Sequence, residues 1–222
     1  MASLDGILGK KTMSGIDDLL AESNDRWSRA KRNADDVEDL GLSQALRTYY
    51  TRYFPAGVLV LVVAGTGVGL LIFGGMLSDW TSYVAFGFVL AAVGATIGGL
   101  IYNAKKVAPA ARLPRTDILY PLETEERKQI NRQIAGKSPV DRAHLSVARA
   151  GAIQQRKSLV RQLLLLPSNL FLFTSLAANW ARRGDPLVWV MLIAVALSIA
   201  GNFFLVRDFR RTSRFLASTS EE

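Results

Sequence analysis

Four segments of this chain are strongly apolar and contain no Asp, Glu, Lys, Arg or His: residues 55–77, 81–104, 163–178 and 187–206. The first is 23 residues long, enough to cross a hydrocarbon core of roughly 30 Å at about 1.5 Å per helical residue. Because the apolar residues are concentrated in these blocks, soluble domains are excluded. The sequence predicts an all-α integral membrane protein with four transmembrane helices, arranged as two hairpins joined by a basic, partly helical cytoplasmic connector.

The third apolar segment is the least regular of the four. It is short, and Pro167-Ser168-Asn169 interrupts it. A proline removes a helical hydrogen bond and crowds the preceding turn. Residues 163–178 therefore have two interpretations, a kinked span extended at its start or a re-entrant segment.

Orientation follows from the distribution of Lys and Arg. The N-terminal segment has 8, the connector 13 and the C-terminal segment 4, whereas the two short turns between paired spans have 0 and 2. The positive-inside rule then places both termini and the connector in the cytoplasm. Trp80, Tyr83, Trp180 and Trp189 fall at the opposite interface, where aromatic belts form. The first residues have no long apolar core behind their positive charge, so we expect no secretory signal peptide.

The chain divides into five predicted parts. They are residues 1–54, an amphipathic helical cytoplasmic segment; 55–104, the first transmembrane hairpin; 105–161, the basic connector with two helices; 162–206, the second transmembrane hairpin; and 207–222, a cytoplasmic tail. In the first part, Ser14 and Asp17 fit a capping box that opens a short helix. A second helix is expected to begin near Ser43 and to run through three tyrosines into the bilayer.

In the connector, one helix is expected to open at residues 122–127 and to end near Gly136, a natural C′ residue. A second is expected to begin with Ser138 as N-cap and Pro139 at N1, and to continue through Arg156 into the membrane.

Small residues recur along the first two spans. Such residues let helix backbones approach closely in lipid, where the hydrophobic effect does not drive association. They indicate packing within the hairpin or self-association of copies. The candidate helix-packing residues are Gly65, Gly69, Gly87, Ala91, Gly94, Ala95, Gly98 and Gly99.

The net positive charge of the connector equals that of the whole chain. Residues 105–161 contain 13 basic and 5 acidic residues, a net +8, which equals the formal net charge of the protein. Such a surface attracts anionic headgroups, and the cytoplasmic helices could instead bind a partner protein. The acidic run Asp35–Asp39 is either a solvated loop or an alternative partner for this charge. We do not expect nucleic acid as a partner, because anionic lipid lies closer to the connector. The candidate lipid-binding or partner-binding residues are Arg127, Lys128, Arg132 and Lys137.

The sequence offers no catalytic, cofactor-binding or metal-binding residues. It has no Cys and a single His, His144, which we expect to be a solvated or interhelical residue. Gly136-Lys137-Ser138 is not a phosphate-binding loop, because that motif requires Gly where Asn131 stands. We therefore expect no enzyme. The favoured function is a membrane scaffold or regulatory subunit that binds a partner protein or anionic lipid. The alternatives are a self-assembling, holin-like pore and an accessory subunit of a transporter.

A further indication comes from Leu122-x-x-Glu125-Glu126-Arg127, Ile134-x-Gly136-x-Ser138-Pro139-Val140-Asp141, Leu145 and Ala148-Arg149-Ala150. With the spans and the Arg-rich exit that follow, residues 120–216 resemble a module of uncharacterised small integral membrane proteins of actinobacteria. The resemblance implies a juxtamembrane helical hairpin attached to a span pair, and a location in a bacterial plasma membrane. It implies no chemistry.

Overall fold

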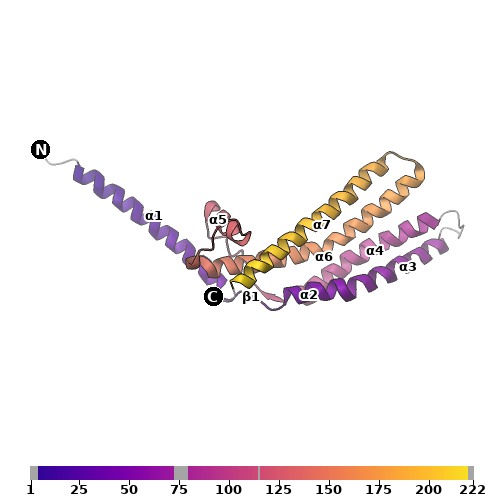
Figure 1. The fold of residues 1–222 in the computed structure, drawn as a ribbon, viewed down its shortest axis with the longest axis horizontal. Helices are drawn as coiled ribbons and strands as arrows, with labels where there is room; N and C mark the ends of the chain where they lie inside the picture. Colours follow the sequence, from indigo (N-terminus) through magenta and orange to yellow (C-terminus); the bar gives the residue numbers. More distant parts are fainter. Residues whose placement is uncertain (1–4, 73–79, 115, 220–222) are drawn as a thin grey trace. The chain divides into compact units, whose positions relative to one another are not determined.

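The computed structural model describes residues 5–72, 80–114 and 116–219, with the backbone alone for residues 5–16. This part of the chain is almost entirely helical (Figure 1). Two short strands, β1 (Glu38–Asp39) and β2 (Ala111–Arg112), form a two-stranded sheet. The helices are α1 (Asp5–Ala34), α2 (Leu42–Thr48), the π-helical turn η1 (Tyr49–Tyr53), α3 (Phe54–Ile72), α4 (Trp80–Tyr102), the π-helical turn η3 (Asn103–Val107), α5 (Thr124–Ile134), the 3₁₀ turn η4 (Arg142–His144), α6 (Leu145–Arg183) and α7 (Leu187–Ser218).

Four continuous helical stretches are long and apolar enough to cross a membrane. They are Leu42–Ile72, Trp80–Val107, Arg142–Arg183 and Leu187–Ser218. The described residues of each predicted span lie within one of them, so the prediction of a helical, multi-pass membrane protein is confirmed, although the two-stranded sheet was not predicted. The expected turn at Ser78–Asp79 lies outside the described residues.

The third span is an uninterrupted helix. α6 is 39 residues long and continues without a break through Pro167, so the interpretation of an interrupted, re-entrant segment is wrong. Pro167 has no N–H to donate to the carbonyl of Leu163, four residues earlier. The hydroxyl of Tyr50 donates to that carbonyl instead, at 2.6 Å. A neighbouring helix thereby satisfies the backbone group that the proline leaves free, which is how membrane helices tolerate proline.

Two predicted helix starts are wrong, and two other helix boundaries are confirmed. Ser14 lies inside α1, which begins at Asp5, and Ser138 precedes the helical turn η4. There Asp141 is the cap, because its carboxylate accepts from the N–H of Ala143 at 3.0 Å. The predicted start near Ser43 is confirmed by α2. The predicted end of α5 is confirmed by Gly136, whose φ of +66° is the left-handed conformation of a C′ glycine.

The chain forms two compact units. The first, here called the connector unit, comprises the described residues up to Glu38, from Leu113 to Gln154 and from Phe215 onward. It has its own hydrophobic core, which draws on α1, the connector and the end of α7. The buried residues of this core are Ala30, Ala34, Ile118, Leu122, Ile130, Ile134, Val147, Ala148, Ala150, Ala152 and Phe215.

The second unit, here called the span unit, comprises Asp39–Arg112 and Gln155–Arg214. Within it α3 and α4 lie side by side (Figure 1). Local contacts also mark where α6 ends and where α7 begins. Gly184, with φ +66°, follows the last residue of α6, and the carboxylate of Asp185 accepts from the N–H of Leu187 at 2.9 Å. The short turn between the third and fourth spans therefore occupies residues 184–186.

Candidate functional site

The four predicted binding residues line one surface: three lie on α5, and Lys137 follows the C-terminal end of this helix. The helix opens with a capping box, in which the carboxylate of Glu126 accepts from the N–H of Glu123 at 2.8 Å. Its apolar face buries Ile130 and Ile134 in the core of the connector unit. Because the apolar residues recur at helical spacing, they share one face of α5, and the opposite, polar face lies at the surface.

A groove of about 500 Å³ lies on this polar face of α5. Among the residues that the structure describes, no carboxylate lines it. The four basic side chains are those predicted from the sequence, and Thr124, Asn131 and Ala135 complete the lining. We call this site the α5 groove; its basic residues are Arg127, Lys128, Arg132 and Lys137.

Local contacts fix one of these cations and draw nearby carboxylates into ion pairs. The guanidinium of Arg127 donates to the carbonyls of Tyr120 at 2.6 Å and Leu122 at 2.8 Å. Lys128 contacts Glu125 at 3.5 Å, an exposed pair that contributes little. The remaining carboxylates of the first turn of α5 pair elsewhere, as described next.

Arg26 of α1 is the partner of those carboxylates. Its guanidinium lies 3.1 Å from Glu123 and 3.5 Å from Glu126. Desolvation lowers the pKa of Arg26, but the hydrogen bond and charge of Glu126, with Glu123 and Glu22, outweigh it, so the pKa lies above its ordinary value. These pairs neutralise acidic charge next to the α5 groove and tie α1 to α5.

The small residues of the two spans form close contacts inside one chain. A Cβ added to Gly65 would lie 2.8 Å from the Cα of Gly87, and one added to Gly87 would lie 2.7 Å from the carbonyl oxygen of Val62. Gly69 approaches the Cα of Tyr83 at 3.3 Å in the same way. These contacts join α3 to α4. Ala91 and Ala95 are buried beside them.

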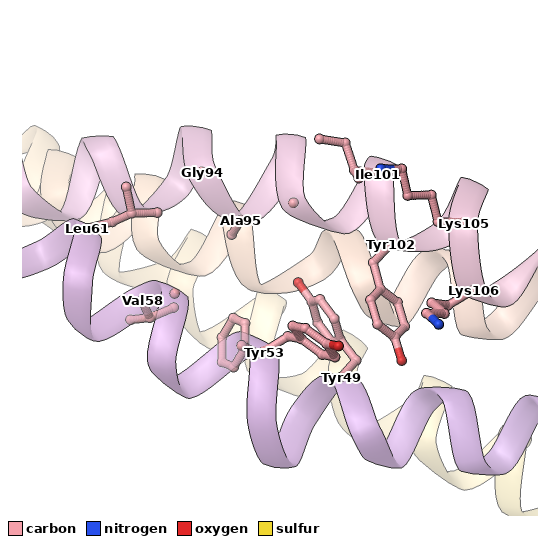
Figure 2. Close-up of a pocket in the computed structure, with 13 residues that line it drawn as sticks. Tyr49, Tyr53, Val58, Leu61, Gly94, Ala95, Ile101, Tyr102, Lys105 and Lys106 are labelled. Atoms are coloured by element: carbon pink, nitrogen blue, oxygen red, sulfur yellow. The ribbon is translucent and has the colours of Figure 1, made fainter.

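The remaining glycines behave differently from one another. Gly99 faces α6, since a Cβ there would lie 3.0 Å from the carbonyl oxygen of Leu164. Gly94 meets only the flexible end of the Leu61 side chain. At Gly98 no described atom outside its own turn lies within 4 Å of an added Cβ. Gly98 therefore makes no close helix contact in this chain, and it lines a cavity. Gly94 lines the same cavity (Figure 2).

Sequence reasoning missed the role of Arg156. Its side chain is 9% exposed and lies 2.5 Å from the carboxylate of Asp39. It also bonds to Ser43 and lies over the ring of Phe209, 4.9 Å from the centroid. The acidic run therefore does supply a partner for connector charge, through Asp39. The other oxygen of Asp39 accepts from the N–H of Gly41 and of the first residue of α2, both at 2.9 Å.

The single histidine is an interhelical residue. The ring of His144 stacks on Trp27 of α1, with centroids 3.6 Å apart and planes 15° from parallel. Within the described part of the chain, no group of three or more His, Cys, Asp or Glu residues could hold a metal ion. The arrangement offers cation-rich and apolar surfaces for binding.

Comparison with known proteins returned no match to any protein-family model, to any curated protein or to any solved structure.

Proposed function

We propose that this chain is a non-enzymatic scaffold or regulatory subunit of a bacterial plasma membrane, whose α5 groove binds an acidic segment of a partner protein. In this proposal two transmembrane hairpins, α3–α4 and α6–α7, are joined by the connector, and both termini lie in the cytoplasm. The observation that carries it is a groove lined by four cations and, among described residues, no carboxylate. The groove lies on a helix fixed by a buried core.

The packed core of the connector unit suggests that the connector does more than set the orientation of the spans in the membrane. Lys and Arg set topology through charge alone, so a connector with only that role needs no buried side chains. Here Leu122 and Ile130 are 2% and 1% exposed. Their burial orders the backbone that presents the basic residues, which lowers the entropy lost on binding.

Groove geometry favours a protein carboxylate over a lipid surface. An anionic membrane surface attracts basic residues through their charge, at about 1 kcal/mol each, and this attraction does not require a groove. A guanidinium fixed in place, as that of Arg127 is, suits paired hydrogen bonds to a carboxylate.

The pore alternative draws less support from the structure than from the sequence. The small residues that motivated it, among them Gly65, Gly69, Gly87 and Gly99, contact other elements of the same chain. Residues already engaged in this way are poor candidates for an interface between copies.

A charge-matched comparison tests the proposal. Lys128, Arg132 and Lys137 are changed to Gln, whereas Arg127 is kept because it holds backbone carbonyls. The control changes Arg207, Arg210 and Arg214 of α7, which are exposed, to Gln. Both variants lose three positive charges. Binding of a fluorescent Glu-rich peptide to the purified full-length protein in uncharged detergent is measured alongside binding to anionic vesicles.

We expect the groove variant to lose most peptide binding and the control variant to keep it. Equal losses in both variants would mean that binding follows net charge and not the groove. Loss of vesicle binding with unchanged peptide binding would identify anionic lipid as the ligand and overturn the protein-partner proposal.

A further inference from the structure

A second cavity lies in the span unit, between α3 and α4 at their charged end. It has a volume of about 350 Å³, at the lower end of the range for small-molecule sites. Figure 2 shows Val58 and Leu61 at one end of it and Lys105 and Lys106 at the other, with the ring of Tyr102 between them. The cavity is therefore apolar in one part and cationic in the other.

The cavity lies where glycines leave space that a larger side chain would fill. At Gly57 and Gly98, which line it, no described atom outside the local helical turn lies within 4 Å of an added Cβ. This is the reverse of Gly87, where the two helices touch. The same helices therefore meet at one level and separate at another.

Aromatic rings and backbone irregularities shape the charged end. The rings of Tyr53 and Tyr49 lie 5.4 Å and 5.0 Å from the ring of Tyr102, so aromatic side chains from η1 and α4 line this end of the cavity. The chain forms a π-helical turn on each side, η1 before α3 and η3 after α4. Single π-helical turns inside helices occur frequently at functional sites.

We propose that this cavity binds one acyl chain of an anionic membrane phospholipid, with its phosphate at Lys105 and Lys106. An apolar slot that ends in two ammonium groups complements a molecule with an apolar chain and an anionic head. A zwitterionic lipid such as phosphatidylcholine has a cationic group beside its phosphate, which offsets the attraction of the phosphate to the two lysines. The volume suits one chain, and the second chain of the lipid stays in the bilayer. This site is separate from the α5 groove and goes beyond the function proposed above.

The test measures thermal unfolding of the purified full-length protein in uncharged detergent. Phosphatidylglycerol, phosphatidylcholine with the same chains, and inorganic phosphate are titrated separately. A ligand that binds the folded state raises the unfolding midpoint in a concentration-dependent way. We expect phosphatidylglycerol to raise it well above the effect of phosphatidylcholine, and inorganic phosphate to leave it unchanged.

Two variants locate the site. Gly98→Leu fills the slot without a backbone clash, so the phosphatidylglycerol shift should disappear while the midpoint without lipid is not lowered. Gly67→Leu is the matched control, because Gly67 of α3 also has open space but does not line the cavity; it should keep the shift. K105Q/K106Q should weaken the apparent affinity for phosphatidylglycerol roughly 30-fold, from about 1 kcal/mol per lysine.

Three results would overturn the proposal. The first is a full phosphatidylglycerol shift in Gly98→Leu, or its equal loss in Gly67→Leu. The second is an equal effect of the two lipids with no change in K105Q/K106Q. The third is reproduction of the shift by inorganic phosphate, which would leave an anion site without an acyl chain.

Discussion

At the scale of single residues, two polar contacts join distant segments of the span unit. The hydroxyl of Tyr50 satisfies the carbonyl of Leu163, and Arg156 shares the carboxylate of Asp39 with the start of α2. Each contact joins segments more than a hundred residues apart. A buried polar group left without a partner costs more than the bond contributes when made, so single substitutions here are informative.

Tyr50→Phe should lower the free energy of unfolding by about 1–2 kcal/mol, because the carbonyl of Leu163 then has no donor. In a Pro167→Ala background the cost should shrink, since Ala supplies the missing N–H from within α6. Denaturant unfolding of the four proteins of this cycle in one detergent gives the coupling energy. Equal costs of Tyr50→Phe in both backgrounds would show that Pro167 is not the reason for the contact.

Arg156→Met should destabilise the protein by roughly 3 kcal/mol, the low end for breaking one side of a buried ion pair, because Asp39 is left as an unpaired carboxylate. Adding Asp39→Asn should recover part of this loss, as Asn keeps the oxygen that accepts from Gly41 and removes the charge. Thermal and denaturant unfolding in detergent provide the comparison. No recovery in the double variant would argue against charge pairing as the main contribution.

At the scale of elements, the contact of α3 with α4 depends on particular glycines and not on the whole stripe. Gly87→Ala should cost about 1–3 kcal/mol, because its new methyl would lie 2.7 Å from the carbonyl oxygen of Val62. Gly67→Ala should be neutral or slightly stabilising, since the site is open and Ala favours helix. Unfolding midpoints of the two variants measure the difference. A tolerated Gly87→Ala would mean that the helices separate at little cost.

At the scale of the whole molecule, substitutions in the core of the connector unit should unfold this unit and leave the spans folded. L122A/I130A removes two side chains from its core, and each should cost about 2–5 kcal/mol. We expect a protease to cleave the variant between residues 113 and 142 much faster than the parent, while helical content and detergent solubility are retained. Aggregation of the whole chain instead would show that the two units unfold together.

Orientation is also a property of the whole molecule, and the chain has no native Cys to interfere with its measurement. In intact cells, Ser78→Cys should react with a membrane-impermeant thiol reagent, and Ala143→Cys should react only after permeabilisation. The expectation rests on the 25 to 2 split of Lys and Arg between the two sides. The opposite labelling pattern would invert the proposed topology.

The sequence by itself determined the helical class, the four apolar stretches and the boundaries of α5. These are local properties: a span needs only length and composition, and Glu126 and Gly136 act on the helix that contains them. The four basic residues that line the α5 groove could also be named, because the net charge of the connector is readable from the sequence.

Only the tertiary structure decided which residues of the stripe make close contacts and how α6 continues through Pro167. Gly87 and Gly98 are both glycines in similar sequence surroundings. Gly87 packs against the backbone of α3, whereas no described atom outside the local turn lies close to the Cβ position of Gly98, which forms part of a cavity wall. The partner of the carbonyl that Pro167 frees, and the partner of Arg156, come from segments far away in the chain. Sequence spacing carries no record of such contacts, because packing at a distance brings them together.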